Sequence, residues 1–358
     1  MKTLFTTQAT NIQLCLLLLA VAGCKSIGPG TVKRDRMHYS SAVADSWKEQ
    51  LLLNIVKTRY GDAPAFLEVA SVVAGYSLET GVSLDGQYTP AGLSGDTFAA
   101  GGVSAKYTDR PTISYTPMTG ERFARSLVSP VPLDSLIFKI QGGVPADFLL
   151  RITAQSIEGH HNQGIYGGQF QPGDASFVRL LQLIRTLSQS RAIESEIIKH
   201  NERVETWIRF HAVAPTNTGL AEAVSELKAL WGIPPALDRV RVVFGTVAPE
   251  PEVIGLRTRS LLQILGTLGG GVQIPEKHTA KGGVVTVAAS QPPGGFAVHS
   301  GEKKPDGAFV AVPYEGQWFW IASEDLVSKT TLSLVTVLFS FLDNSGKQSA
   351  PVLTIPTN

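Results

Sequence analysis

Few residues of this chain have the types and spacing that would support catalysis. Ser225 and Lys228 fit the S-x-x-K pattern of serine nucleophiles, and Lys329, followed by two threonines, faintly matches a K-T-G element. The asparagine motif that should lie between these two elements is missing, because no Asn occurs between Lys228 and Asn344. We therefore interpret the S-x-x-K match as a coincidence inside an amphipathic helix.

Two adjacent histidines offer the strongest metal-binding pattern. His160 and His161 lie in a glycine-flanked segment with Glu158 and Asn162 beside them. Imidazole and carboxylate groups are common metal ligands, but neighbours on one loop seldom converge on an ion without a further partner. We predict a solvated surface loop and no metal site, and keep a metal site as the alternative.

Glu324, Asp325 and Lys329 form a third group, which could act in acid–base chemistry. The simpler interpretation is a turn followed by a helix capped by Ser328, with acidic residues near its positive end. The chain has no nucleophile elbow, phosphate-binding loop, dinucleotide fingerprint or H-E-x-x-H motif. The sequence therefore predicts no catalytic residues, no cofactor and no enzyme.

The first residues predict where the protein resides. Lys2 precedes an apolar run over residues 14–22, which is short for a membrane span but suits a secretory signal. The run ends in Val-Ala-Gly-Cys at residues 21–24, which resembles a bacterial lipobox. That resemblance implies cleavage between Gly23 and Cys24 and acylation of Cys24. Two acyl chains would anchor the protein stably to a membrane. An ordinary signal peptide with an incidental Cys is the alternative.

The cysteine count and the charge exclude several classes of protein. Of the 2 cysteines, Cys15 would leave with the signal and Cys24 would carry lipid, so the mature body has no disulfide and no cysteine-based site. The full chain has a net charge of +1, and removing residues 1–23 takes away one Lys and no acid. A neutral surface with scattered charges does not predict nucleic-acid binding.

The strongest periodic pattern predicts a long β-hairpin over residues 68–117. Apolar and small or polar residues alternate from residue 70 to 88 and again from residue 99 to 108, with turn-rich residues between them. The apolar positions coincide in a register that pairs Val72 with Ile113, Leu78 with Tyr107, Glu79 with Lys106, and Val82 with Val103. The pattern fits a half-buried hairpin in a periplasmic sheet, which we favour, or a hairpin of an oligomeric outer-membrane pore.

The whole chain predicts an α+β fold. It divides into four segments: a signal peptide (residues 1–23), a lipidated flexible tether (24–35), a helix with the hairpin (36–118) and a mixed periplasmic body (119–358). The helix should begin near Ser40 or Ser41 and end at Gly61. In the body we expect a strand over 148–157, a helix over 257–268, loop between 275 and 305 with a possible sub-boundary there, and a buried helix over 328–342. A last strand is predicted over 351–356.

Several short motifs give a family resemblance. They are Ser46-Trp47-Lys48-Glu49-Gln50, Asn54-Ile55-Val56, Arg59-Tyr60, the run from Pro111 to Pro117, and Ser328-Lys329. In these patches the chain is similar to an uncharacterised group of proteobacterial lipoproteins, which implies no activity and no site residues. Lys25, rather than Asp, after the acylated Cys resembles the sorting pattern of outer-membrane lipoproteins.

These observations lead to one expected function and two alternatives. We expect an outer-membrane-anchored lipoprotein with its body in the periplasm, acting as a structural or binding component of an envelope assembly. Its partners would be the membrane, other envelope proteins and other copies of itself. The alternatives are a subunit of an oligomeric export pore built from β-hairpins and a periplasmic cell-wall hydrolase whose catalytic residues are scattered along the chain.

The anchor is directly testable. Cys24→Ser should abolish labelling of the protein by an alkyne fatty acid and should leave an unprocessed precursor, because the acylated side chain is removed. Labelling is measured by click chemistry on the immunoprecipitated protein, with Cys15→Ser as the control that should label normally. Unchanged labelling of the Cys24→Ser protein would rule out a lipid anchor at this residue.

Overall fold

The computed structural model describes residues 27–73, 76–87, 98–109, 112–166, 169–200, 203–214, 216–248, 250–284 and 293–342. The chain divides into two compact units. The first comprises residues 1–45 and 67–117, and the second comprises residues 46–66 and 118–358. The predicted strand over 351–356 and the predicted signal and acylation residues, Gly23 and Cys24, lie outside the described residues.

The first described element is helix α2 (Ile27–Arg59), which contributes to both units. It ends as predicted: Gly61 has a φ of +79°, and the N–H of Asp62 donates to the carbonyl of Lys57 at 2.9 Å, which closes the last turn. Its start differs from the prediction, because residues 27–35 are helical rather than a flexible tether. Apolar spacing could not reveal this part, since its described side chains are mostly exposed and carry no apolar stripe.

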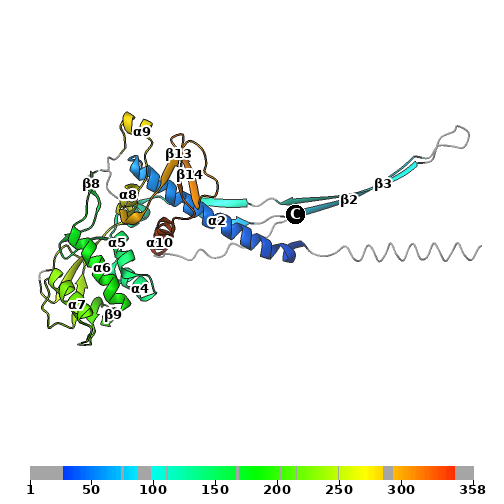
Figure 1. Ribbon diagram of the computed structural model, residues 1–358. Helices are drawn as coiled ribbons and strands as arrows, with labels where there is room; N and C mark the ends of the chain where they lie inside the picture. The colour runs from blue at the N-terminus through cyan, green and yellow to red at the C-terminus, as the bar shows by residue number, and fades with distance from the viewer. Residues whose placement is uncertain are drawn as a thin grey trace, which may run out of the picture. The chain divides into compact units, whose positions relative to one another are not determined.

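The first unit contains two antiparallel strand pairs. Strand β1 (Leu67–Val73) pairs with β4 (Thr112–Pro117), and β2 (Tyr76–Gln87) pairs with β3 (Phe98–Asp109). In Figure 1, β2 and β3 run side by side as a long ribbon. The predicted hairpin is therefore confirmed.

The second unit is built around a six-stranded sheet in the order β6-β5-β12-β11-β10-β9. Only β11 and β12 run parallel to each other, and the other neighbours are antiparallel. The strands are β5 (Ala154–Ile157), β6 (His160–His161), β9 (Ile193–His200), β10 (Arg203–Phe210), β11 (Arg239–Val243) and β12 (Val253–Thr258).

Four helices pack with this sheet around one apolar cluster (Figure 1). The apolar face of α6 is buried, from Phe177 to Leu187. These helices are α4 (Leu133–Gln141), α5 (Ala146–Thr153), α6 (Ala175–Gln189) and α7 (Thr218–Leu230). The short strands β7 (Gly164–Tyr166) and β8 (Gln169–Gln171) pair with each other.

A second apolar cluster joins the C-terminal half of α2 to the last part of the chain. Leu52, Ile55 and Val56 of α2 are fully buried in it, as are Phe319 and Val335. The other contributing elements are α3 (Glu121–Val128), α8 (Leu261–Gly269), α10 (Leu326–Leu342) and the three-stranded sheet of β13 (His299–Gly301), β15 (Gln317–Ile321) and β14 (Val310–Tyr314). The core role predicted for the C-terminal helix agrees with this burial.

Three sequence predictions for the second unit were wrong in part. Residues 148–153 of the predicted strand over 148–157 belong to α5, and only residues 154–157 are a strand, β5. Residues 257–258 of the predicted helix belong to β12, so that α8 begins only after Ser260. The segment 275–305 contains α9 (Glu276–Lys281), the 3-10 turn η1 (Pro293–Gly295) and β13, and it buries Phe296. Short apolar runs buried on several sides have no periodicity that separates a helix from a strand.

One buried arginine connects the segments where the two clusters meet. Arg259 is 1% exposed, and its guanidinium donates to the carbonyl of Ile152 at 3.0 Å and to the carbonyl of Gln163. The Ile152 carbonyl lies at the C-terminal end of α5, the negative end of the helix dipole. The backbone of Arg259 also bonds to Thr153 and Val131, at 2.7 and 3.0 Å.

Removal of this guanidinium should destabilise the second unit. Arg259→Met keeps the length of the apolar stem but leaves buried carbonyls without donors, so we expect a loss of at least about 3 kcal/mol in unfolding free energy. Urea denaturation followed by circular dichroism measures the change. The control is Arg125→Met, which removes an exposed i,i+4 ion pair with Glu121 and should change stability by less than about 1 kcal/mol.

Candidate functional site

Lys228, the lysine of the S-x-x-K match, has bonds that give it a structural role. Lys228 lies on α7, and its Nζ donates to the carbonyls of Pro235 and Leu237, both at 2.7 Å. It also lies 4.7 Å from the centroid of the Phe210 ring. Burial lowers the pKa of Lys228, while the charge of Asp238 opposes that shift. Because the ammonium group donates to two backbone carbonyls of the loop after α7, this side chain holds that loop in place.

The polar groups of the histidine segment bond to other parts of the body, and the histidines themselves form the short strand β6. The two ring nitrogens of His160 lie 2.7 Å from Ser176 Oγ and 2.9 Å from the carbonyl of Leu230. Glu158 has a φ of 45°, and its carboxylate accepts from the N–H groups of Gly255 and Ala248. The prediction of a solvated loop was therefore wrong, because these polar groups bond to other segments of the body.

Asn162 has the same kind of structural role. It is 5% exposed, and its Nδ2 donates to the carbonyls of Arg151 and Ala154 at 2.8 and 2.9 Å. Within the described ranges, no group of three or more His, Cys, Asp or Glu side chains could hold a metal ion.

The acidic turn before α10 caps the helix as predicted, with one change of residue. Asp325 accepts from the N–H of Ser328 at 3.0 Å and also from its hydroxyl, so Asp325 is the cap and Ser328 lies inside the helix. Ser328 Oγ in turn accepts from the N–H of Ala297. Lys329 donates to the carbonyl of Ser323. These bonds give Asp325 and Lys329 structural roles at the start of α10.

The β2–β3 ribbon is the clearest candidate interface. Its register pairs Leu78 with Tyr107, Glu79 with Lys106, and Val82 with Val103, in an unbroken ladder from Tyr76↔Asp109 to Gln87↔Phe98. These are the predicted pairs. Apolar residues therefore pair mainly with apolar or small ones at alternate positions, while the positions between them are largely polar or glycine.

The β1–β4 ladder continues the same register. Val72 pairs with Ile113 as predicted, and the register shifts before Ser71, where Ala70 is an extra residue between two paired positions. Every residue of β4 is exposed, including Ile113 at 42% and Tyr115 at 58%. Apolar side chains of this ladder are thus open to solvent.

Both ladders have two free edges within the described residues. Among the described strands, β2 pairs only with β3, and β1 pairs only with β4. A lone two-stranded ribbon is marginally stable in water, and unpaired edges recruit further strands. The expected larger periplasmic sheet around the hairpin is not seen in this part of the chain.

The chain was compared with known proteins. No protein-family model, curated protein or solved structure matches it. The resemblance to proteobacterial lipoproteins stays a prediction. Among the described helices, none is long and apolar enough to cross a lipid bilayer.

The register can be tested by introduced cysteines, because residues 25–358 contain no cysteine. Val82→Cys with Val103→Cys should form an intramolecular disulfide on mild oxidation, since directly opposite Cβ atoms lie about 4.5–5.5 Å apart. Non-reducing electrophoresis detects the bond. Val82→Cys with Ser104→Cys is the control, and it should remain reduced, because adjacent strand residues point to opposite faces. Equal oxidation of both pairs would contradict the register.

Proposed function

We propose that this protein is an outer-membrane-anchored periplasmic lipoprotein whose β2–β3 hairpins assemble edge to edge into an oligomeric export pore. Acylation at Cys24 would hold each copy at the membrane. The observation that carries the proposal is the β2–β3 ladder, with its alternating residues and two open edges. The pore was an alternative to the structural envelope role expected from the sequence, and the open edges of the ladder are the reason to propose it.

Edge pairing between copies explains why the ribbon has no third strand of its own. If β3 of one copy pairs with β2 of the next, the contact is head-to-tail, and repeating it around a closed ring leaves no edge unpaired. A closed ring is also required in lipid, where unpaired backbone groups are costly. The smallest closed sheets that span membranes have about eight strands, so at least about four copies are needed.

Strand length and residue pattern support insertion into a membrane. β2 and β3 have 12 residues each, and a tilted strand needs about 9–11 residues to cross the hydrocarbon layer. Leu78, Val82 and Leu84 share one set of alternate positions, which would face lipid. Glu79 and Ser83 share the other set, which would face the lumen.

The hydrolase alternative receives no support from the described side chains. Of the candidates that the sequence offered, Lys228 and His160 are bonded to backbone carbonyls, and Asp325 accepts from the N–H group and hydroxyl of Ser328. The remaining competitor is a hairpin that pairs with a different envelope protein in the periplasm. The experiment below distinguishes that outcome from self-assembly.

Two adjacent substitutions on β2 provide a matched test. Val82→Arg puts a charge on the proposed lipid face near the middle of the strand, where it costs about 2–4 kcal/mol per copy, whereas Ser83→Arg puts the same charge in the lumen. We expect the full-length Ser83→Arg protein to form a ring in mild detergent and to release dye from vesicles. The Val82→Arg protein should do neither.

Light scattering of the detergent-extracted protein and dye release from liposomes are the two measurements. Thermal unfolding of both variants shows whether the body is still folded. A monomeric wild-type protein, or equal behaviour of the two variants, would contradict the pore. Capture of a different protein by the hairpin of a monomeric chain would favour the competing interface.

A further inference from the structure

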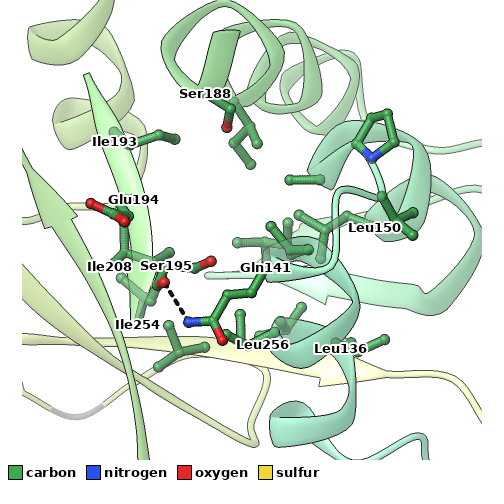
Figure 2. Close-up of a pocket in the computed structure, with 18 of the residues that line it drawn as sticks. Leu136, Gln141, Leu150, Ser188, Ile193, Glu194, Ser195, Ile208, Ile254 and Leu256 are labelled. Carbon is green, nitrogen blue, oxygen red and sulfur yellow. Dashed lines mark hydrogen bonds between the residues drawn. The ribbon is translucent and has the colours of Figure 1, made fainter. Parts of the chain in front are cut away.

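The second unit contains a cavity of about 740 Å³ between the six-stranded sheet and its helices. In Figure 2, Ile193, Glu194 and Ser195 follow β9 on one side, while Leu136 and Leu150 lie with the helices on the other. This volume is within the range of about 300–1,000 Å³ that is typical of small-molecule sites. It is about five times the volume of an engineered cavity that binds benzene, about 150 Å³.

The walls of this cavity are mainly aliphatic. Leu136, Ile184, Ile254 and Leu256 line it and are each less than 7% exposed to solvent. Protein interiors are normally packed without voids of this size, and a large apolar cavity loses dispersion contacts unless something fills it. The lining therefore favours an apolar ligand.

Polar groups also line the cavity, and most of them already have partners. Gln141 Nε2 donates to the carbonyl of Ser195 at 3.0 Å, the bond drawn in Figure 2. Glu194 Oε2 lies 3.1 Å from Nε2 of His211. Ser188, at the end of α6, is the remaining labelled polar residue.

Trp231 supplies a donor without an acceptor. Its side chain lines the cavity, the residue is 3% exposed, and its indole Nε1 has no hydrogen-bond partner among the described residues. A buried N–H of this kind normally finds an acceptor, and its desolvation is unfavourable when it does not. Because this nitrogen has almost no accessible surface, a ligand in the cavity contacts the apolar part of the indole ring rather than its N–H.

Arg191 supplies a positive charge at an unusual backbone position. It follows α6 with a φ of 57°, where the N–H of Ala192 closes the helix by donating to Leu187 at 2.8 Å. Glycine is the usual residue at this left-handed position, so an arginine here costs backbone strain, which its charge beside the C-terminal end of the helix dipole partly offsets. Its side chain lines the cavity, and no described residue forms a hydrogen bond or an ion pair with its guanidinium.

We infer that this cavity binds an amphipathic ligand with an apolar acyl chain and an anionic head group. The aliphatic walls and the Trp231 ring hold the chain, and the guanidinium of Arg191 pairs with the anion. A free fatty acid and a lysophospholipid with a terminal phosphate share this chemistry. The inference uses the second unit alone and does not depend on pore formation.

Photocrosslinking tests the inference with the full-length lipoprotein in lipid nanodiscs. The probe is a palmitate analogue with a diazirine in its chain, and peptide mass spectrometry locates the crosslinks. We expect crosslinks on α4, β9 and β12. Unlabelled palmitate or 1-palmitoyl lysophosphatidate should compete at least about tenfold more strongly than methyl palmitate, since a hydrogen bond to a charged group corresponds to that factor or more. The stronger of the two anions identifies the source of the head group.

Three variants separate the ligand's two parts. Arg191→Gly should melt at a temperature equal to or above that of the wild type, because glycine suits the backbone, yet it should lose the preference for anions. Ala146→Trp fills the cavity and should abolish crosslinking. Arg185→Ala, on α6 but outside the cavity lining, should behave as the wild type. Crosslinks elsewhere, normal crosslinking of a folded Ala146→Trp protein, or equal competition by the ester would overturn the inference.

Discussion

The body of this protein depends on satisfying the carbonyl groups at the C-terminal end of α5. A helix that ends in the interior leaves its last carbonyls without intrahelical partners, and water cannot reach them there. Arg259 and Asn162 supply the missing donors from two distant segments. These bonds fix the end of α5 against two other segments. One is the residue that follows β12, Arg259, and the other is the residue that follows β6, Asn162.

The rest of the second unit follows from this junction. β5 begins directly after α5 and pairs with β12, and α8 begins directly after Arg259 with a Ser260–Gln263 capping box. One apolar cluster forms around the six-stranded sheet, and the other forms around α8, α10 and the end of α2. The large cavity lies in the first cluster, beside the sheet, where α4 and α6 do not fill the space between them with side chains.

A different constraint governs the first unit. There the backbone of β2 and β3 is paired along its whole described length, but each strand has one edge without a partner in the described chain. Small and apolar residues at alternate positions give such a ribbon little core of its own. In the proposed ring of copies, each of these edges pairs with an edge of the neighbouring copy.

Local patterns in the sequence determined the hairpin and the register of β2 with β3, because strict alternation makes one set of apolar positions coincide there. They also determined the end of α2 at Gly61, but not the register shift at Ala70 in β1. Only the tertiary structure decided that residues 146–153 are helical and that Arg259 is buried, since both depend on carbonyls and donors far apart in the chain. It also gave His160 and Lys228 structural partners, and it brought Trp231 and Arg191 to one cavity. An arginine at a helix end normally closed by glycine was the one local signal of that cavity, and its meaning depends on neighbours that only the fold supplies.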